Sequence, residues 1–152
     1  MLYTTLKFLH VLLAIFAVGF NSAYGLIIAR ARKAGTDGRE LRFALRTVKV
    51  MDDYIANPCY VLLLLTGVAM VHVGGLPWSL LWIHASMALL VVVAVIAFAF
   101  YTPTLRKQIA ALEAGGAASP EFRRLSKRGA MLGGILGVLV VVIVALMVFK
   151  PV

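Results

Sequence analysis

The chain has 152 residues, of which 62% are hydrophobic and 14% are charged, and its mean hydropathy is +0.99. Soluble domains carry about 25% charged residues and about 45–50% apolar ones, so this composition excludes an ordinary soluble globule and a disordered chain. The single cysteine, Cys59, excludes an intrachain disulfide framework and a cysteine-rich metal cluster. The length accommodates about four membrane-spanning helices and no large domain outside the membrane.

Four apolar segments are long enough to cross a bilayer, for which a helix needs about 20 residues. In chain order, we predict spanning helices at about 2–29, 54–73, 79–101 and 129–149. The intervening segments 30–53 and 102–128 are predicted to be cytoplasmic loops. The sequence therefore predicts an all-α integral membrane protein that forms one domain over residues 1–152, a bundle of four transmembrane helices.

The positions of the basic residues predict the topology. Of the 15 lysines and arginines, seven lie in residues 30–53 and six in residues 102–128, and the others are Lys7 and Lys150. Basic residues in short loops stay on the cytoplasmic side. We therefore expect both basic loops to be cytoplasmic and both termini to be outside, in a bacterial cytoplasmic (inner) membrane. The net charge of +9 then indicates contact with the lipid bilayer and its anionic headgroups, and no nucleic acid partner is expected.

Parts of the two loops carry helix signals. Residues 39–49 have a basic face and an opposite apolar face formed by Leu41, Leu45 and Val48, which predicts a short helix lying on the inner membrane surface. In the second loop, Ser119, Pro120 and Glu121 are typical of the start of a helix, with a cap, a proline in the first turn and an early acid. This helix is expected to continue into the fourth span.

Polar residues inside the first span form one stripe at helical spacing. The stripe contains Tyr3, Lys7, His10, Ala14, Asn21 and Gly25. Because ionisable groups are costly in the bilayer, the stripe is expected to face the bundle, whereas Phe8, Leu12 and Phe16 are expected to face lipid. Lys7 and His10 are neighbours on this face, three residues apart.

The histidines are predicted to gather in the outer half of the membrane. His84 lies about 160° around the third helix from Trp82, so it points inward if the tryptophans face lipid. With His10 and with His72 at the outer end of the second helix, it forms a candidate site for haem iron or a metal ion such as copper. The alternative is that His10 and His84 bond to neighbouring helices and that His72 lies in water at the rim.

Other polar and small residues have two interpretations or a structural one. Asp52 and Asp53 belong either to a proton path or to surface pairs with Lys49 or Arg46. Asn21 and Asn57 are expected to form hydrogen bonds between helices. A repeat of small residues every four positions on the fourth helix predicts close helix packing; it comprises Gly129, Gly133 and Gly137.

Two segments resemble HemJ-type protoporphyrinogen oxidases. The opening TLKFLHVLLAIFAVGFNSAYGLIIARARKA resembles the first helix of that family, with a Lys-x-x-His pair before a glycine and an aromatic-rich helix end. LWIHASMALL resembles the family's tryptophan–histidine helix start. With FYTPTLRKQ and ALMVFKP, the whole chain more closely resembles an uncharacterised bacterial family of four-helix integral membrane proteins, related to HemJ and to copper-resistance D-like proteins.

The resemblance implies that His10 is a haem ligand with Lys7 beside it. HemJ proteins carry a lysine two residues after the histidine of the third helix, where this chain has Ser86, so an oxidoreductase activity is left open and no catalytic residue is assigned. The leading hypothesis is binding of haem b or a related porphyrin in the outer half of the bundle, for electron transfer or porphyrin oxidation. The proposed binding residues are His10, His84, Lys7, Tyr3 and Asn21.

Two alternatives come from other functional classes. The chain could be a non-catalytic accessory subunit of a larger membrane complex or a homo-oligomer, assembled through the glycines of the fourth helix. It could also transport copper or another small solute, an interpretation based on His10, His72 and His84.

Overall fold

The computed structural model describes residues 1–34 and 38–151, and its secondary structure is entirely helical over these residues. α1 (Leu2–Ala34) and α6 (Pro120–Phe149) are uninterrupted helices. These two helices are the first and fourth of four continuous helical rods. The second rod consists of α2 (Arg39–Met51) and α3 (Asn57–Val73), joined by a π-helical turn, η1 (Asp52–Ala56). The third rod likewise joins α4 (Leu81–Val95) to α5 (Thr102–Gly115) through η2 (Ile96–Tyr101). All four rods are long and apolar enough to cross a membrane, which confirms the predicted fold class.

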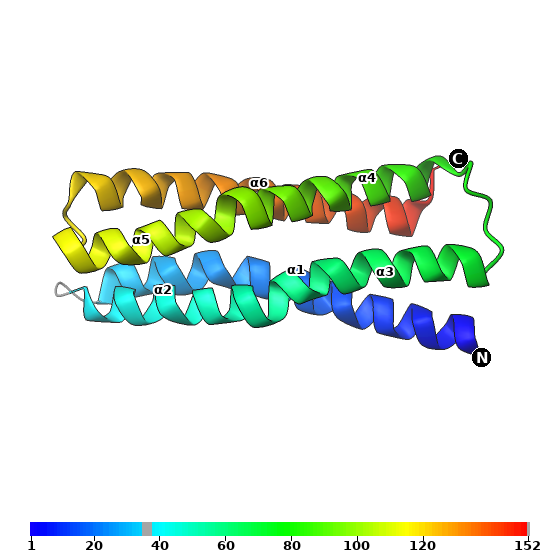
Figure 1. Ribbon diagram of the computed structural model, residues 1–152, viewed down its shortest axis with the longest axis horizontal. Helices are drawn as coiled ribbons and strands as arrows, with labels where there is room; N and C mark the ends of the chain where they lie inside the picture. The colour runs from blue at the N-terminus through cyan, green and yellow to red at the C-terminus, as the bar shows by residue number, and fades with distance from the viewer. Residues whose placement is uncertain (35–37, 152) are drawn as a thin grey trace.

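The four rods form an antiparallel bundle (Figure 1). α1 packs against α2, α3 and α6, while α4 packs against α3 and α6, so α1 and α4 occupy opposite corners. Both chain termini and the α3–α4 connection lie at one end, which we call the termini end. The α5–α6 turn lies at the other end, which we call the basic end because the arginine-rich segments are there (Figure 1).

The predicted surface helix at residues 39–49 is instead part of the bundle. Leu41, Leu45 and Val48 are 4%, 0% and 0% exposed, and α2 packs against α1 and α5. The expectation that this helix lies on the membrane surface is therefore wrong, because protein rather than lipid covers its apolar face. α5 packs in the same way against α2 and α6, so the segments expected to be loops lengthen the bundle.

The helix start predicted near residue 119 is present. The Ser119 side chain accepts a hydrogen bond of 3.2 Å from the Phe122 amide, and Pro120 occupies the first helical position of α6. This cap satisfies one of the amide groups that a helix leaves without an internal partner.

The length of each rod indicates where the membrane ends. A hydrocarbon core about 30 Å thick corresponds to about 20 helical residues. Counted from the termini end of each rod, this length reaches Tyr24, Asp53, Tyr101 and Gly129. We call this level, on the side of the basic end, the inner edge. For a span that starts at the termini end, the residues beyond this level, including α2 and α5, project past the hydrocarbon.

Candidate functional site

The predicted polar stripe on α1 faces the bundle along one side and is exposed along its other edge. Tyr3, His10 and Asn21 are half-buried, whereas Lys7 and Gly25 are exposed, contrary to expectation. The opposite face behaves as predicted: Phe8, Leu12 and Phe16 are all exposed. At 100° per residue, Lys7 and Gly25 lie about 40° to one side of Tyr3 and Asn21, so they form the exposed edge of the stripe.

His10 forms a hydrogen bond with the neighbouring helix. Its Nδ1 lies 2.7 Å from the Thr66 hydroxyl oxygen, which in turn lies 2.7 Å from the Leu62 carbonyl oxygen. A hydroxyl has one proton and a carbonyl only accepts, so this geometry favours Nδ1–H of His10 as the donor to Thr66. The ring lies against α3 at Gly67, where an added Cβ would make an ordinary van der Waals contact of 3.5 Å with Cε1 of His10.

His84 points away from the interior, so the expectation that it faces inward is wrong. Its side chain is exposed, while Ser86 is 1% exposed and Ile83 is 2% exposed on the opposite side of α4. The direction of His84 was inferred on the assumption that Trp82 faces lipid. Trp82 is instead half-buried, and its ring centre lies 5.5 Å from the Lys150 ammonium group. That cation–π contact keeps Trp82 beside the C-terminal end of α6 rather than in lipid.

The histidines do not form a common site. His10 faces α3, His84 is on the opposite corner of the bundle, and His72 is exposed with its ring edge-on to Trp78 at 6.2 Å. Within residues 1–34 and 38–151, no three His, Cys, Asp or Glu side chains are grouped to hold a metal ion. The residues present therefore do not fit a haem or a metal ion held between His10 and His84.

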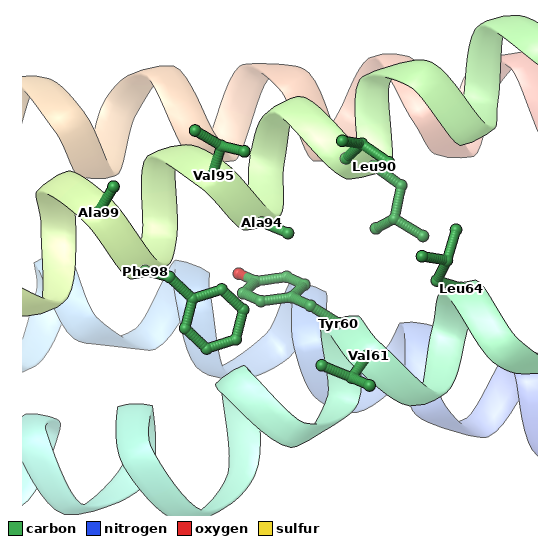
Figure 2. Close-up of a pocket in the computed structure, with 9 residues that line it drawn as sticks. Tyr60, Val61, Leu64, Leu90, Ala94, Val95, Phe98 and Ala99 are labelled. Atoms are coloured by element: carbon green, nitrogen blue, oxygen red, sulfur yellow. The ribbon is translucent and has the colours of Figure 1, made fainter.

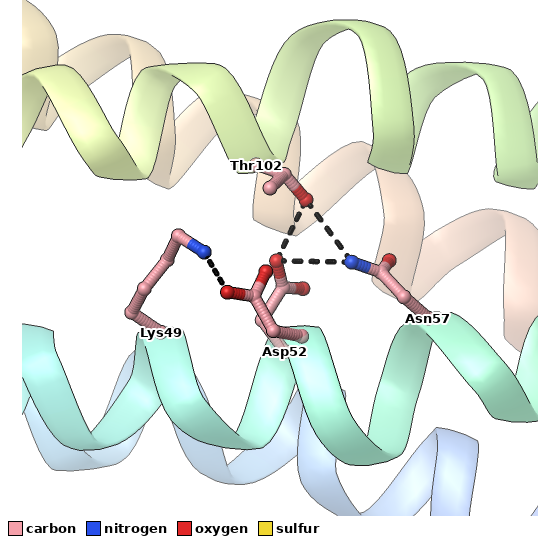
Figure 3. Close-up of polar contacts among 5 residues, drawn as sticks. Lys49, Asp52, Asn57 and Thr102 are labelled. Carbon is pink, nitrogen blue, oxygen red and sulfur yellow. Dashed lines mark hydrogen bonds and ion pairs between the residues drawn. The ribbon is translucent and has the colours of Figure 1, made fainter.

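A buried polar cluster lies instead at the inner edge, between the second and third rods. Asp52, Asn57 and Thr102 are 2%, 7% and 6% exposed. Thr102 Oγ1 donates a hydrogen bond of 2.6 Å to Asp52 Oδ2. Asn57 Nδ2 lies 3.5 Å from the same carboxylate oxygen and 3.4 Å from Thr102 Oγ1 (Figure 3). We refer to these three residues as the Asp52 cluster.

The π-helical turn places Asp52 and Asn57 on the same side. In a regular α-helix, residues five apart point about 140° away from each other. In η1, the Asn57 amide bonds to the Asp52 carbonyl, five residues earlier, and the turn is wide enough to align the two side chains. η2 repeats this geometry, because the Thr102 amide bonds to the Ala97 carbonyl. π-Helical turns often mark functional sites.

A proline follows each of these turns, with one residue between them. Pro58 comes after Asn57, and Pro103 comes after Thr102. Proline has no amide proton and collides with the preceding turn, which favours a local departure from α-helical bonding. The sequence signal that could have located the cluster is therefore the pair Asn57-Pro58 and Thr102-Pro103, each at the inner end of a predicted span.

The two aspartates have different environments. Asp53 forms an ion pair with Lys49, one turn earlier, which agrees with the predicted alternative of a surface ion pair. Arg46 pairs with Glu113 at 2.6 Å, not with an aspartate. Asp52 has hydrogen bonds but no ion pair with any residue in the described part of the chain. The structural interpretation therefore accounts for Asp53 and leaves Asp52 to be explained.

Unused hydrogen-bonding groups surround the Asp52 cluster. The Asn57 Oδ1 atom and the hydroxyl of Tyr24 are buried without a partner among the residues described. The Tyr24 ring stacks on Tyr101, with ring centres 6.4 Å apart. Buried polar groups in native proteins are nearly always satisfied, so these two atoms are available to bond with a water, an ion or a ligand.

A lipid-facing groove of about 390 Å³ separates α3 from α4 on the membrane side of the cluster. Its lining is apolar except at Tyr60, whose hydroxyl lies between the helices beside Ala94 (Figure 2). Tyr60 is 4% exposed and follows Asn57 by three residues. The groove therefore approaches the Asp52 cluster from the bilayer, with Tyr60 between them.

Two of the three glycines in the predicted repeat face other helices of the same chain. A Cβ on Gly129 would collide with Gln108 of α5, and a Cβ on Gly133 would lie 3.7 Å from Tyr101. A Cβ on Gly137 would have no atom within 4 Å. Gly129 thus lets α6 approach the third rod closely, as small residues do in membrane helices, whereas Gly133 faces that rod at ordinary contact distance.

Comparison with known proteins agrees with this architecture. The model of a family described as "Predicted integral membrane protein (DUF2269)" matches residues 4–151. No curated protein and no solved structure matches the chain.

Proposed function

The chain belongs to this DUF2269 family of predicted integral membrane proteins, and from that premise we propose that it binds and moves a proton or small monovalent cation through the Asp52 cluster. The observation that carries the proposal is a carboxylate 2% exposed, held by Thr102 and Asn57, at the inner edge of a transmembrane bundle. Ionisable residues inside a membrane bundle commonly mark ion paths and proton relays.

The charge of Asp52 requires a counterion. A buried carboxylate is costly unless a proton or a cation neutralises it. Lys49 is paired with Asp53 and acts on Asp52 only at longer range, and no lysine or arginine in the described part of the chain forms an ion pair with Asp52. The available ligands are oxygen atoms: the Asp52 carboxylate, the Thr102 hydroxyl and the free Asn57 carbonyl. Oxygen ligands suit a proton or a hard cation, whereas copper prefers sulfur and imidazole. Of the predicted transport substrates, the cluster thus favours a hard ion over copper.

A second polar contact lies further toward the termini end, between the first and second rods. Thr66 is nine residues beyond Asn57 on α3, about 14 Å along the helix, and it bonds to His10 of α1. Half-buried Asn21 of α1, with its Nδ2 unpartnered, lies near the level of the cluster. These groups suggest a path along the α1–α3 interface that joins the Asp52 cluster to the termini end.

Flux through purified protein tests this function. Vesicles containing the chain should carry protons, Na⁺ or K⁺ down an imposed gradient, measured with dyes trapped inside, faster than empty vesicles. Asp52→Asn keeps the shape and removes the charge, and it should abolish the flux. Asp53→Asn makes the same charge change one residue away and should retain it. Flux equal to that of empty vesicles, or full flux in Asp52→Asn, would overturn the proposal.

Porphyrin binding at His10 is the second candidate. With Nδ1 bonded to Thr66, His10 keeps Nε2 free, and metal-binding histidines are commonly oriented by such a bond on the other nitrogen. This supports a single-ligand haem b site in the outer half, and not a pair with His84. The absorption spectrum of purified protein from haem-replete cells, oxidised and then reduced, tests it. A haem band lost in His10→Ala and kept in His84→Ala would support this candidate, and a colourless protein would exclude it.

We further propose that the basic end is cytoplasmic and the termini are outside, in a bacterial cytoplasmic membrane. The concentration of basic residues at one end of the bundle supports this orientation. A relationship to HemJ-type or copper-resistance D-like proteins and an accessory role in a larger complex rest on sequence alone. The glycine repeat gives less support to assembly through α6, because Gly129 and Gly133 pack within the chain.

A further inference from the structure

A groove of about 540 Å³ lies between α1 and α2 beyond the inner edge, and we propose that it binds the headgroup of an anionic phospholipid. Both helices contribute cationic and apolar side chains to it. The lining consists of Ile27, Arg30, Ala31, Arg39, Glu40, Phe43, Ala44 and Thr47. The site is separate from the Asp52 cluster, so the inference does not rest on the proposed ion pathway.

The net positive charge of the groove favours binding of an anion. Arg30 comes from α1 and Arg39 from the start of α2, both are exposed, and neither forms an ion pair with a residue in the described part of the chain. Guanidinium groups bind phosphate through two parallel hydrogen bonds. Glu40 is the acidic residue in the lining, and it leaves the groove with an excess of positive charge.

An apolar track connects the groove with the bilayer. Phe43, Val50 and Tyr54 are 74%, 57% and 78% exposed. They are spaced by seven and four residues, so they share one face of the second rod. This face runs from the groove to the inner edge, where the hydrocarbon begins. A phospholipid fits this feature, with its phosphate at the Arg30 and Thr47 side of the groove, Arg39 on the far side, and its acyl chains along Val50 and Tyr54.

The membrane side of the groove lies at the depth of a headgroup. Arg30 lies six residues past Tyr24 on α1, which is about 9 Å beyond the inner edge. Arg39 lies at the far side of the groove, 14 residues before Asp53, which is about 21 Å beyond that edge. The polar layer of a bilayer extends about 5–8 Å past the hydrocarbon, and a flexible arginine side chain reaches back along the helix to it. A soluble acidic partner has no need of the apolar track, so the combination favours a lipid.

Lipid retention by the detergent-purified full chain tests the site. The protein is incubated with phosphatidylglycerol or phosphatidylcholine, and bound lipid is counted by native mass spectrometry. Phosphatidylglycerol should bind preferentially, and inorganic phosphate should not displace it. In Arg30→Gln/Arg39→Gln, binding should weaken roughly 30-fold, as expected for two basic residues near an anionic lipid. Phe43→Ser should also weaken it, with an unchanged melting temperature showing that the variant is folded.

The matched control removes two exposed arginines from α6. Arg123→Gln/Arg124→Gln loses the same charge outside the groove and should retain the lipid. An equal loss in both double variants would show general attraction to the basic end and would overturn the site. Equal binding of the two lipids would overturn it as well, as would capture of an acidic protein with no preference for either lipid.

Discussion

Thr102 and Asp52 join the two interrupted rods of the bundle through a hydrogen bond of 2.6 Å, although 50 residues separate them in the sequence. Each lies in or directly beside a π-helical turn that precedes a proline. The bond therefore links the two irregular points of the bundle at the level where the hydrocarbon ends. Its removal is expected to affect both stability and the proposed ion site.

Thr102→Val should destabilise the protein by about 1–3 kcal/mol, because it keeps the side-chain shape and deprives a buried carboxylate of a donor. The measurement is thermal or denaturant unfolding in detergent. A double-mutant cycle with Asp52→Asn should give a coupling of about 0.5–3 kcal/mol. Strictly additive effects of the two substitutions would contradict a direct bond.

Gly129→Ala and Gly137→Ala should have opposite effects on unfolding. An alanine at position 129 displaces the Gln108 amide, which is 3% exposed and bonds to the Leu125 carbonyl at 3.1 Å. Loss of that buried bond should cost about 1–3 kcal/mol. Gly137→Ala meets no atom within 4 Å and replaces a poor helix former, so it should be neutral or stabilise by up to about 1 kcal/mol. Destabilisation at position 137 would instead indicate a second chain against this face.

Thr66→Val should weaken the α1–α3 contact by about 0.5–1.5 kcal/mol, because His10 loses its partner. His84→Ala should leave the unfolding free energy within about 0.5 kcal/mol, since its side chain is exposed. Both variants can be compared by the shift in melting temperature at fixed detergent concentration. A large loss in His84→Ala would show that this histidine contacts something in the membrane.

Single cysteines at the two ends should differ in reactivity if the basic end is cytoplasmic. In a Cys59→Ala background, Ser79→Cys marks the α3–α4 connection and Ala117→Cys marks the α5–α6 turn. A membrane-impermeant maleimide should label position 79 in intact cells and position 117 only after lysis. The reverse pattern would invert the proposed topology.

Cys59 itself should remain unlabelled in the folded wild-type protein, because its side chain is 6% exposed. Labelling by a permeant maleimide should require unfolding by detergent or heat. Rapid labelling of native protein would show that the packing between α3 and its neighbours opens readily.

The predictions from helical periodicity succeeded over short segments and failed where a distant reference was needed. Phe8, Leu12 and Phe16 are exposed as predicted because they lie within three turns of one helix. The direction of His84 was inferred from Trp82, which Lys150 holds from the far end of the chain. A contact between residues 68 positions apart cannot be detected from the local sequence pattern of one helix.

Hydrophobic length and charge by themselves determined that this chain forms four spanning helices and that its basic residues gather at one end. These properties follow from the cost of placing each side chain in lipid, which depends on composition over about 20 residues. Only the tertiary structure decided that α2 and α5 lengthen the bundle and that Asp52 meets Asn57 and Thr102. Packing partners cover the apolar face of α2, and two widened turns redirect side chains by more than a quarter of a turn, which regular helical spacing cannot anticipate.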